Sequence, residues 1–248
     1  RDFCLSRGLG DVYKRQKEVS ETFTVDAIDI YLFAVYDTGV STSFELTDDG
    51  YYIPTSTDGK TTQTRFSDYT LNDGEIYSVD MTLPADWSTY TDDCGPVFSA
   101  SAFNEEKTSF IGEPYVTMFI SAPTKANGAI EFWGDVDTPN GTVEAQLIAR
   151  YRLGGDLLKD TPYEKKMLAY QESDEEATFT LTYRRVERTV EGVTKISYYI
   201  GIDGIEYICL TTGEVAVRYS EISNAANAFS TKHTGNIVGL RAKTKGVK

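Results

Sequence analysis

The chain has 248 residues, of which 40% are hydrophobic and 12% aromatic, and its formal net charge is −14 at pH 7. This composition can build a core and excludes a disordered acidic chain, because such chains lack aromatic residues. The acidic balance argues against nucleic acids and anionic membranes as partners, since both require clustered Lys and Arg, and no apolar run approaches the roughly 18 residues of a membrane span.

Residues 1–16, RDFCLSRGLGDVYKRQ, differ in charge from the rest of the chain. They sum to +2, whereas residues 17–248 sum to −16. The part GLGDVYKRQ resembles the translated adapter sequence that recurs at the ends of open reading frames from metagenomic assemblies, and such segments are excluded from fold reasoning. A disordered basic leader is the alternative. We therefore expect residues 1–16 to be a poorly packed, non-native leader of a fragment, and we do not count Cys4 towards a disulfide.

A match between two segments of the chain predicts an internal repeat. IYLFAVYDTGV, at 30–40, aligns without gaps with IVGLRAKTKGV, at 237–247, and both begin with Ile and end with Gly-Val. Arrays of such units are common in repeat proteins. We interpret residues 17–43 as the tail strand of a preceding repeat and residues 44–248 as the next repeat, without its final strand. Two unrelated strands that each end in a glycine turn would explain the same match.

Alternating apolar and polar residues predict β-strands along most of residues 44–248. Between these runs lie turn clusters such as TKANG and DTPNG, in which Gly and Asn tolerate positive φ. The predicted strands cover 76–84, 114–123, 129–136, 145–153 and 177–187. Many short strands with turns between them are typical of an all-β sandwich or barrel.

The sharpest local signal is KISYYIGIDGIEYICL, at 195–210. Its apolar residues alternate up to Ile202, and Asp203-Gly204 supplies a two-residue turn, which predicts a β-hairpin with a type I′ turn. The one stretch with helical character is SEISNAANAF, at 220–229, which is too short to organise a fold.

Residues 44–248 contain, in this order, FELTDDGYYIP, GEIYSVDMTLP, CGPVFSASAFN, the hairpin above and the closing VGLRA. This order resembles the concanavalin A-like lectin and glucanase superfamily, in particular laminin-G-like domains of bacterial surface proteins. The resemblance implies an all-β, two-sheet antiparallel jelly-roll sandwich in which one sheet is concave and the N-terminal and C-terminal strands are adjacent. A missing final strand would leave an open edge, which we expect residues 23–42 to fill.

Glucanases of this superfamily carry a Glu-x-Asp-x-x-Glu cluster, and EFWGDVDT, at 131–138, imitates only its opening. Asp135 and Asp137 share a strand face, but Thr138 follows and no third carboxylate stands where the acid is required. The single His233 lies in a polar loop without a nucleophile elbow. We therefore expect no enzymatic activity, with a degenerate glycoside hydrolase as the alternative.

Aromatic side chains are the candidates for sugar binding, because sugars stack on aromatic faces and are oriented by polar groups. The first candidates are the two Trp residues: Trp87, on a predicted loop with Tyr90 nearby, and Trp133, in a predicted strand. A further candidate is Tyr199, which lies opposite the apolar row of its hairpin. The alternatives are core packing for Trp133, covering of the sandwich edge for Trp87, and an ordinary solvent-facing position for Tyr199.

Calcium is the one cofactor that we consider, because it binds carboxylate and carbonyl oxygens in loops. The candidate ligands are Asp92 and Asp93 in TDDCG, and Asp135 and Asp137 in DVDTPNG. Neither set has a fixed ligand spacing, so a solvated turn is the alternative. Cys94 and Cys209 could form one disulfide, but two cysteines are too few to decide.

The sequence thus predicts a non-catalytic carbohydrate-binding or adhesive module of a secreted, repeat-containing bacterial surface protein. Its expected partners are a glycan and neighbouring repeats, and its expected place is extracellular or at the cell surface. A structural spacer without a ligand is the main alternative. An exposed aromatic platform on the concave sheet would favour binding, and a flat polar face would favour the spacer.

Overall fold

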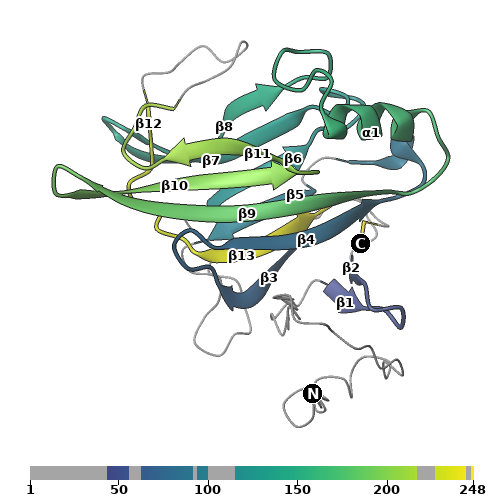
Figure 1. The fold of residues 1–248 in the computed structure, drawn as a ribbon, viewed down its shortest axis with the longest axis horizontal. Coiled ribbons are helices and arrows are strands. Elements are labelled where there is room, and N and C mark those ends of the chain that lie inside the picture. Colours follow the sequence, from purple (N-terminus) through teal and green to yellow (C-terminus); the bar gives the residue numbers. More distant parts are fainter. Residues whose placement is uncertain (1–43, 56–62, 92–93, 100–114, 217–226, 244–246) are drawn as a thin grey trace, which may run out of the picture.

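The computed structural model describes residues 44–55, 63–91, 94–99, 115–216, 227–243 and 247–248. Two antiparallel sheets lie face to face (Figure 1), so the predicted all-β sandwich is confirmed. The smaller sheet has the order β11 (Ile205–Thr211), β10 (Val193–Ile202), β9 (Ala177–Val190) and β4 (Ile76–Leu83). The larger sheet has the order β12 (Ala228–Phe229), β7 (Ile130–Thr138), β6 (Tyr115–Ile120), β5 (Gly95–Ser99), β13 (Ile237–Ala242) and β3 (Gln63–Thr70), with β8 (Gly141–Tyr151) also paired to β7.

Four short elements complete the fold, one of which is the 3-10 helix η2 (Trp87–Thr89). Strands β1 (Phe44–Leu46) and β2 (Tyr52–Pro54) form a separate hairpin, and helix α1 (Pro162–Gln171) lies at one end of the sandwich (Figure 1). Among the described residues, no helix combines the length and apolarity needed to cross a membrane. The predicted leader, the tail strand at 17–43 and the edge-filling segment at 23–42 lie outside the described residues.

Strand β9 shows why the two sheets pack on one side only. Its buried residues alternate with hydroxyl-bearing ones from Ala177 to Tyr183, so one face is apolar and the other carries Thr178, Thr180 and Thr182. Successive strand residues point to opposite faces, and in antiparallel sheets one face commonly packs on the core while the other faces water. The apolar face of β9 therefore meets the larger sheet.

Aromatic rings join the two sheets in the core. The ring of Phe98 on β5 lies 5.4 Å from that of Tyr183 on β9 and 5.1 Å from that of Tyr198 on β10. Phe132 on β7 lies 6.3 Å from Tyr207 on β11. Such pairs add to the free energy gained by burying the rings, so the aromatic residues noted in the composition hold the sandwich together.

The predicted hairpin is confirmed as β10 and β11. Asp203 and Gly204 have φ values of 48° and 80°, which is the pair of positive values that a type I′ turn requires. Strand β13 lies between β3 and β5. Strands from early and late parts of the chain are therefore adjacent in one sheet, although β1, the first strand of the described residues, pairs with β2 in a separate hairpin.

The predicted helical character of residues 220–229 is contradicted at the end of the stretch. Ala228 and Phe229, which lie in the predicted stretch 220–229, form strand β12 against β7, and residues 220–226 lie outside the described residues. The helix that exists, α1, begins after Thr161, whose hydroxyl accepts a hydrogen bond of 3.1 Å from the backbone N–H of Glu164. The sequence TPYE contains the Thr-x-x-Glu signature of a helix start, with Pro in the first position, and this signal could have located α1.

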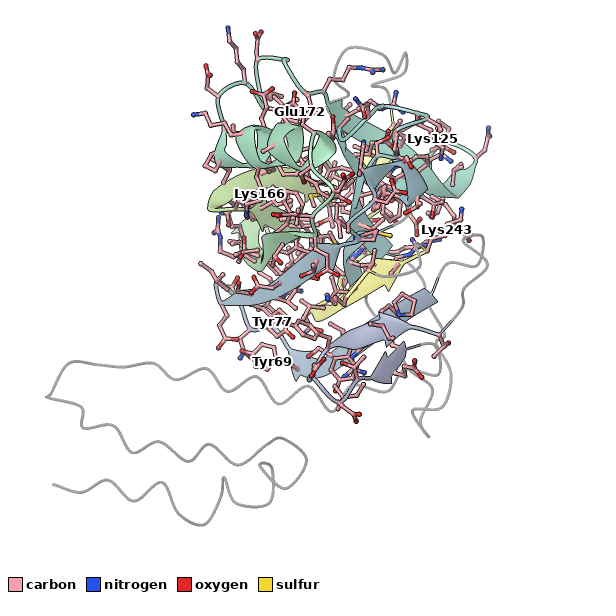
Figure 2. All side chains as sticks on the ribbon, turned by 90° about the vertical axis from the view of Figure 1, so that its right-hand side faces the viewer. Tyr69, Tyr77, Lys125, Lys166, Glu172 and Lys243 are labelled. Atoms are coloured by element: carbon pink, nitrogen blue, oxygen red, sulfur yellow. The ribbon has the colours of Figure 1, made fainter. Side chains whose placement is uncertain are left out.

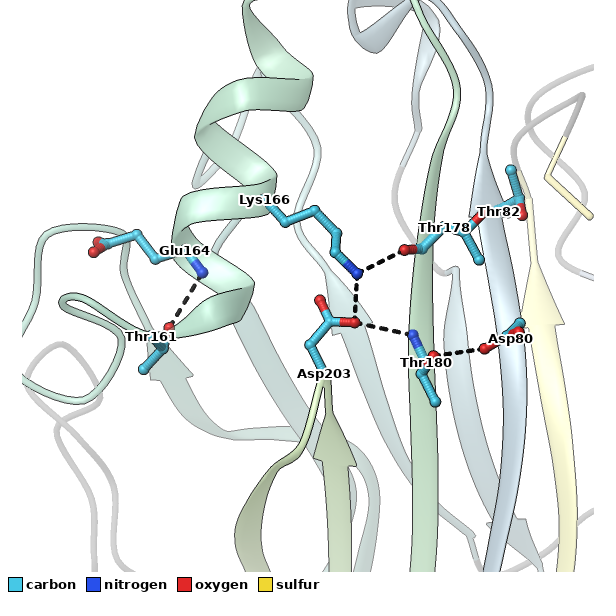
Figure 3. A network of polar contacts seen from close by, with 8 residues as sticks. All are labelled: Asp80, Thr82, Thr161, Glu164, Lys166, Thr178, Thr180 and Asp203. Atoms are coloured by element: carbon cyan, nitrogen blue, oxygen red, sulfur yellow. Dashed lines mark hydrogen bonds and ion pairs between the residues drawn. The ribbon is translucent and has the colours of Figure 1, made fainter.

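Helix α1 is tied to the β10–β11 turn by Lys166 (Figure 3). The Lys166 Nζ atom lies 2.7 Å from Asp203 Oδ1 and 2.9 Å from the Thr178 carbonyl oxygen. Asp203 Oδ1 also accepts a bond of 3.1 Å from the Thr180 N–H. The Asp203 side chain is only 6% exposed, whereas that of Lys166 is 40% exposed. The carboxylate therefore depends on these donors in place of water.

Replacing Lys166 by Met should destabilise the fold, because it leaves the buried Asp203 carboxylate without its cation. We expect a loss of about 2 kcal/mol in the free energy of unfolding, between the values typical of exposed and of buried ion pairs. Urea denaturation measures it. The matched control is Lys165→Met on the exposed side of the same helix, which should change little, and equal losses in the two variants would contradict the role given to Lys166.

Candidate functional site

Trp87 and Tyr90 are packing residues in the structure. Trp87 is 8% exposed, its ring stacks on Tyr90 at 4.9 Å and meets Tyr170 edge-on at 5.5 Å. The indole N–H donates to Asn127 Oδ1 over 3.1 Å, and the Tyr90 hydroxyl donates to the Ile120 carbonyl over 2.7 Å. Neither ring offers a free face to a sugar, so the interpretation of Trp87 as a cover of the sandwich edge fits better than the ligand role.

Tyr199 lies on the outer face of the smaller sheet under a charged side chain. The Arg184 guanidinium stands 4.0 Å from the centre of its ring and pairs with the Glu206 carboxylate. Hydroxyl pairs occupy the same face, with 2.8 Å between Thr82 and Thr178 and 2.9 Å in the pair Ser197 and Thr211. The polar groups of this face thus bind one another, and one face of the Tyr199 ring is covered.

Trp133 lies in a different environment, on the outer face of the larger sheet. Its half-buried indole donates from Nε1 to Glu131 Oε2 over 3.1 Å, and Glu131 Oε1 accepts from Arg150 Nε over 2.7 Å. The Phe119 ring lies 6.3 Å from the indole, and the Arg241 guanidinium stands 5.3 Å from the centre of the Phe119 ring. We call these five residues the Trp133 cluster.

Strand register builds this cluster. Phe119 on β6, Glu131 on β7 and Arg150 on β8 are directly opposite one another, so their side chains form one row across three strands. Trp133 is two residues from Glu131 and therefore shares its face. Sequence reasoning identified Trp133 but missed Glu131 and Arg150. The period of two along EFW could have pointed to Glu131, whereas Arg150 required the pairing of β7 with β8.

The cluster has the groups that a sugar site uses. An aromatic face can stack on the C–H side of a pyranose, and the Arg150 guanidinium, fixed by Glu131, presents donors for hydroxyl groups. The Glu131 side chain is 5% exposed and that of Arg150 is 22% exposed. The guanidinium and the indole are thus the groups that a ligand can reach, while the carboxylate holds both in position.

Asp135 and Asp137, the residues of the imitated glucanase motif, bind the backbone and hydroxyls of neighbouring segments. Asp135 Oδ1 accepts from the Ala145 N–H over 3.0 Å. Asp137 accepts from the Thr142 hydroxyl over 2.9 Å and from the Thr231 N–H over 2.8 Å. Burial alone would raise the pKa of Asp137, but these hydrogen bonds outweigh it and hold the pKa below its usual value. The two carboxylates therefore anchor the β7–β8 turn.

Only some of the residues named in the remaining metal and cysteine predictions are among the described residues. Asp92 and Asp93 lie outside the described residues, and the described residues contain no group of three or more His, Cys, Asp or Glu side chains placed to hold a metal ion. Cys94 carries a buried thiol and forms no disulfide, and its sulfur accepts from the Lys243 N–H over 3.4 Å.

His233, expected in a polar loop, is completely buried. Its Nδ1 atom lies 2.9 Å from the Tyr198 hydroxyl and accepts from the Gly235 N–H over 3.2 Å. Burial, the main cause, lowers its pKa from 6.5 to about 3. The ring is therefore neutral at pH 7 and belongs to the core.

A pocket of about 170 Å³ opens at the seam between the edges of the two sheets. The hairpin β1–β2 covers it, and Arg65 stands 3.6 Å from the centre of the Tyr52 ring there. Figure 2 shows Tyr77, one of its lining residues, beside Tyr69 on this side of the molecule, and their rings stack at 5.7 Å. The lining is rich in apolar and tyrosine side chains from β4 and β13, namely Tyr77, Val79, Met81, Val238 and Leu240.

Comparison of the chain with protein-family models, with curated proteins and with solved structures gave no match.

Proposed function

We propose that the chain is a non-catalytic carbohydrate-binding module and that the Trp133 cluster is its binding site. The observation that carries the proposal is the partly exposed indole beside the Glu131–Arg150 ion pair. Of the four aromatic candidates, Trp133 has a partly accessible ring whose N–H bonds directly to a charged pair on a sheet face, whereas the Arg184 guanidinium covers one face of the Tyr199 ring. These groups are held by cross-strand contacts, so they are arranged before a ligand arrives, and this lowers the entropy cost of binding.

The proposed setting is a secreted or cell-surface protein with neighbouring repeats. The two-sheet sandwich and the position of β13 beside β3 support a concanavalin-like, laminin-G-like fold. The acidic chain suits a soluble surface module, because a large net charge opposes self-association. Fold alone does not imply function, so the ligand class follows from the cluster and is tested there.

Trp133→Ala should weaken glycan binding strongly. A glycan array identifies ligands of the unaltered chain, and titration calorimetry then compares the variants. We expect at least a tenfold loss of affinity in Trp133→Ala and a smaller loss in Trp133→Phe, because Phe keeps an aromatic face but not the N–H donor.

Tyr199→Ala is the matched control, since it removes an aromatic ring from the outer face of the other sheet. Unchanged affinity in Trp133→Ala would refute the site, as would an equal loss in Tyr199→Ala. Thermal unfolding of each variant separates a loss of binding from a loss of fold.

A structural spacer is the second candidate, and the outer face of the smaller sheet favours it. Its hydroxyl pairs and the Arg184–Glu206 pair bind one another and leave a polar surface. Absence of binding to any glycan by the correctly folded chain would favour this function over the first.

Calcium binding at Asp92 and Asp93 stays a prediction. If these residues hold Ca²⁺, protein treated with EDTA should release or take up heat on titration with CaCl₂, and its melting temperature should rise, since a ligand of the native state stabilises it. The variant Asp93→Asn should remove both effects. Neither heat nor a shift in melting temperature would dispose of the site.

A further inference from the structure

The turn clusters TKANG and DTPNG each contain an Asn-Gly dipeptide, and Asn127-Gly128 and Asn140-Gly141 are the two such dipeptides of the chain. An asparagine before glycine is prone to deamidation, because glycine has no Cβ atom to shield the backbone nitrogen that attacks the carboxamide carbon. In a folded protein the asparagine side chain must also be able to move, and this nitrogen must be accessible. The surroundings of the two dipeptides differ in both respects.

Asn127-Gly128 is held by contacts from three segments of the chain. The Asn127 Oδ1 atom accepts from the Trp87 indole over 3.1 Å, and the Nδ2 atom donates to Gln171 Oε1 over 3.4 Å. The attacking nitrogen is bound as well, because the Gly128 N–H donates to the Ser121 carbonyl over 2.8 Å. The space beside it is closed, since a Cβ atom at Gly128 would lie 2.7 Å from Gln171 Nε2. Deamidation of Asn127 would therefore have to break several contacts first.

Asn140-Gly141 lies in the exposed turn between β7 and β8. The Asn140 N–H donates to Thr138 Oγ1 over 3.2 Å, and the Thr138 hydroxyl donates to the Gly141 carbonyl over 2.7 Å. Within the described ranges, no residue forms a hydrogen bond with the Asn140 carboxamide. A Cβ atom at Gly141 would meet no atom within 4 Å. The side chain of Asn140 is thus held by nothing described, and the space beside Gly141 is open.

We propose that Asn140 is a site of spontaneous deamidation in the folded protein and that the fold protects Asn127. The Gly141 nitrogen forms a bond to Asn140 Cγ, the Cγ–Nδ2 bond breaks, and the proton of the Gly141 N–H leaves with Nδ2 as ammonia. Water then opens the resulting succinimide ring at either of its two carbonyls, which gives aspartate or isoaspartate. Water is the one other reactant, and the proposal stands independently of glycan binding at the Trp133 cluster.

The reaction changes the β7–β8 turn in charge and in length. Both products carry a carboxylate where the unaltered chain has a neutral carboxamide. In isoaspartate the main chain runs through the side-chain carbons, so the loop between the paired residues Thr138 and Gly141 becomes one atom longer. We therefore expect two products of equal mass that chromatography separates.

The test incubates the full chain below its melting temperature in a mildly alkaline buffer, because the attacking nitrogen must lose its proton. Trypsin then releases residues 126–150 as one peptide that contains both dipeptides, and tandem mass spectrometry assigns the change from amide to acid to one asparagine or the other. We expect Asn140 to react at least about tenfold faster than Asn127. This ratio corresponds to about 1.4 kcal/mol in activation free energy, the order of one hydrogen bond that Asn127 must break.

Three controls accompany the measurement. In guanidinium chloride, which unfolds the chain, the two asparagines should react at similar rates, because the contacts of Asn127 are lost. Asn140→Asp supplies the aspartate form of the peptide, so the other product of the unaltered chain is identified as isoaspartate. Asn140→Gln should lack the fast reaction, since a glutamine would have to close a larger ring.

Three results would overturn the proposal. Asn127 reacting as fast as Asn140 in the folded chain would show that the fold gives it no protection. An unchanged Asn140 in the folded chain, at a time when it has reacted in guanidinium chloride, would show that the turn prevents the attack. A ratio as large in guanidinium chloride as in the folded chain would show that the local sequence sets the difference.

Discussion

Between pH 6.5 and pH 4, the unaltered protein should lose stability more steeply than a His233→Gln variant. The pKa of His233 is about 3 in the folded state, against 6.5 for a histidine in water. The unfolded chain therefore takes up the proton first as the pH falls. The stabilisation is complete above pH 6.5 and is lost on the way down to the folded pKa, with a slope of about 1.4 kcal/mol per pH unit.

By pH 4 this difference amounts to about 3 kcal/mol relative to neutral pH. Urea denaturation at a series of pH values gives the free energy of unfolding of each protein as a function of pH. Subtracting the curve of His233→Gln from that of the unaltered protein removes the contribution of the carboxylates, because both proteins contain them. Lys232→Gln is the matched control, because it changes an exposed neighbour and leaves the buried imidazole of His233 in place. Parallel curves for the unaltered protein and His233→Gln would show that the buried imidazole does not set the slope.

Phe98→Ala should destabilise the sandwich by about 3 to 5 kcal/mol, as is typical when a fully buried Phe is truncated and leaves a cavity. Phe98 is completely buried and lies against Tyr183 and Tyr198, so its ring fills the space between the two sheets. Phe98→Leu retains much of the volume and should cost about 1 to 2 kcal/mol.

Equilibrium unfolding in urea gives these values, and the control is Ile76→Ala, since Ile76 is 62% exposed. That control should lose no more than about 0.5 kcal/mol. A loss in Phe98→Ala as small as in Ile76→Ala would mean that the two sheets are not held together at this point.

The strands were the most predictable part of this protein. The alternation in ATFTLTYRRVE corresponds to β9, and Asp203-Gly204 predicted both the hairpin and its turn type. The helix was missed although TPYE carries a capping signature and although Tyr163, Met167 and Tyr170, which α1 buries, recur at helical spacing. Phe229 ends the stretch with predicted helical character, yet it pairs with Val136 on β7, a contact that the local sequence does not encode.

The candidate site was less predictable than the fold. Trp133 was identified as one of four aromatic residues, but its neighbours Glu131 and Arg150 were not. The same reasoning chose Trp87, which packs against Tyr90 and Tyr170. An aromatic residue on a loop is compatible with either a binding platform or a cover of the core, and which of the two it becomes depends on the elements that reach it.

By itself, the sequence determined the secondary structure along the well-patterned runs and the two-faced character of each strand, because these depend on neighbours within a few residues. Only the tertiary structure decided that His233 lies in the core, that Glu131 meets Arg150, and that Lys248 pairs with Thr82 at the edge of β4. The reason is physical: period-two patterning says that a side chain faces one of two sides, whereas burial and partners follow from the register between strands that are far apart in the chain.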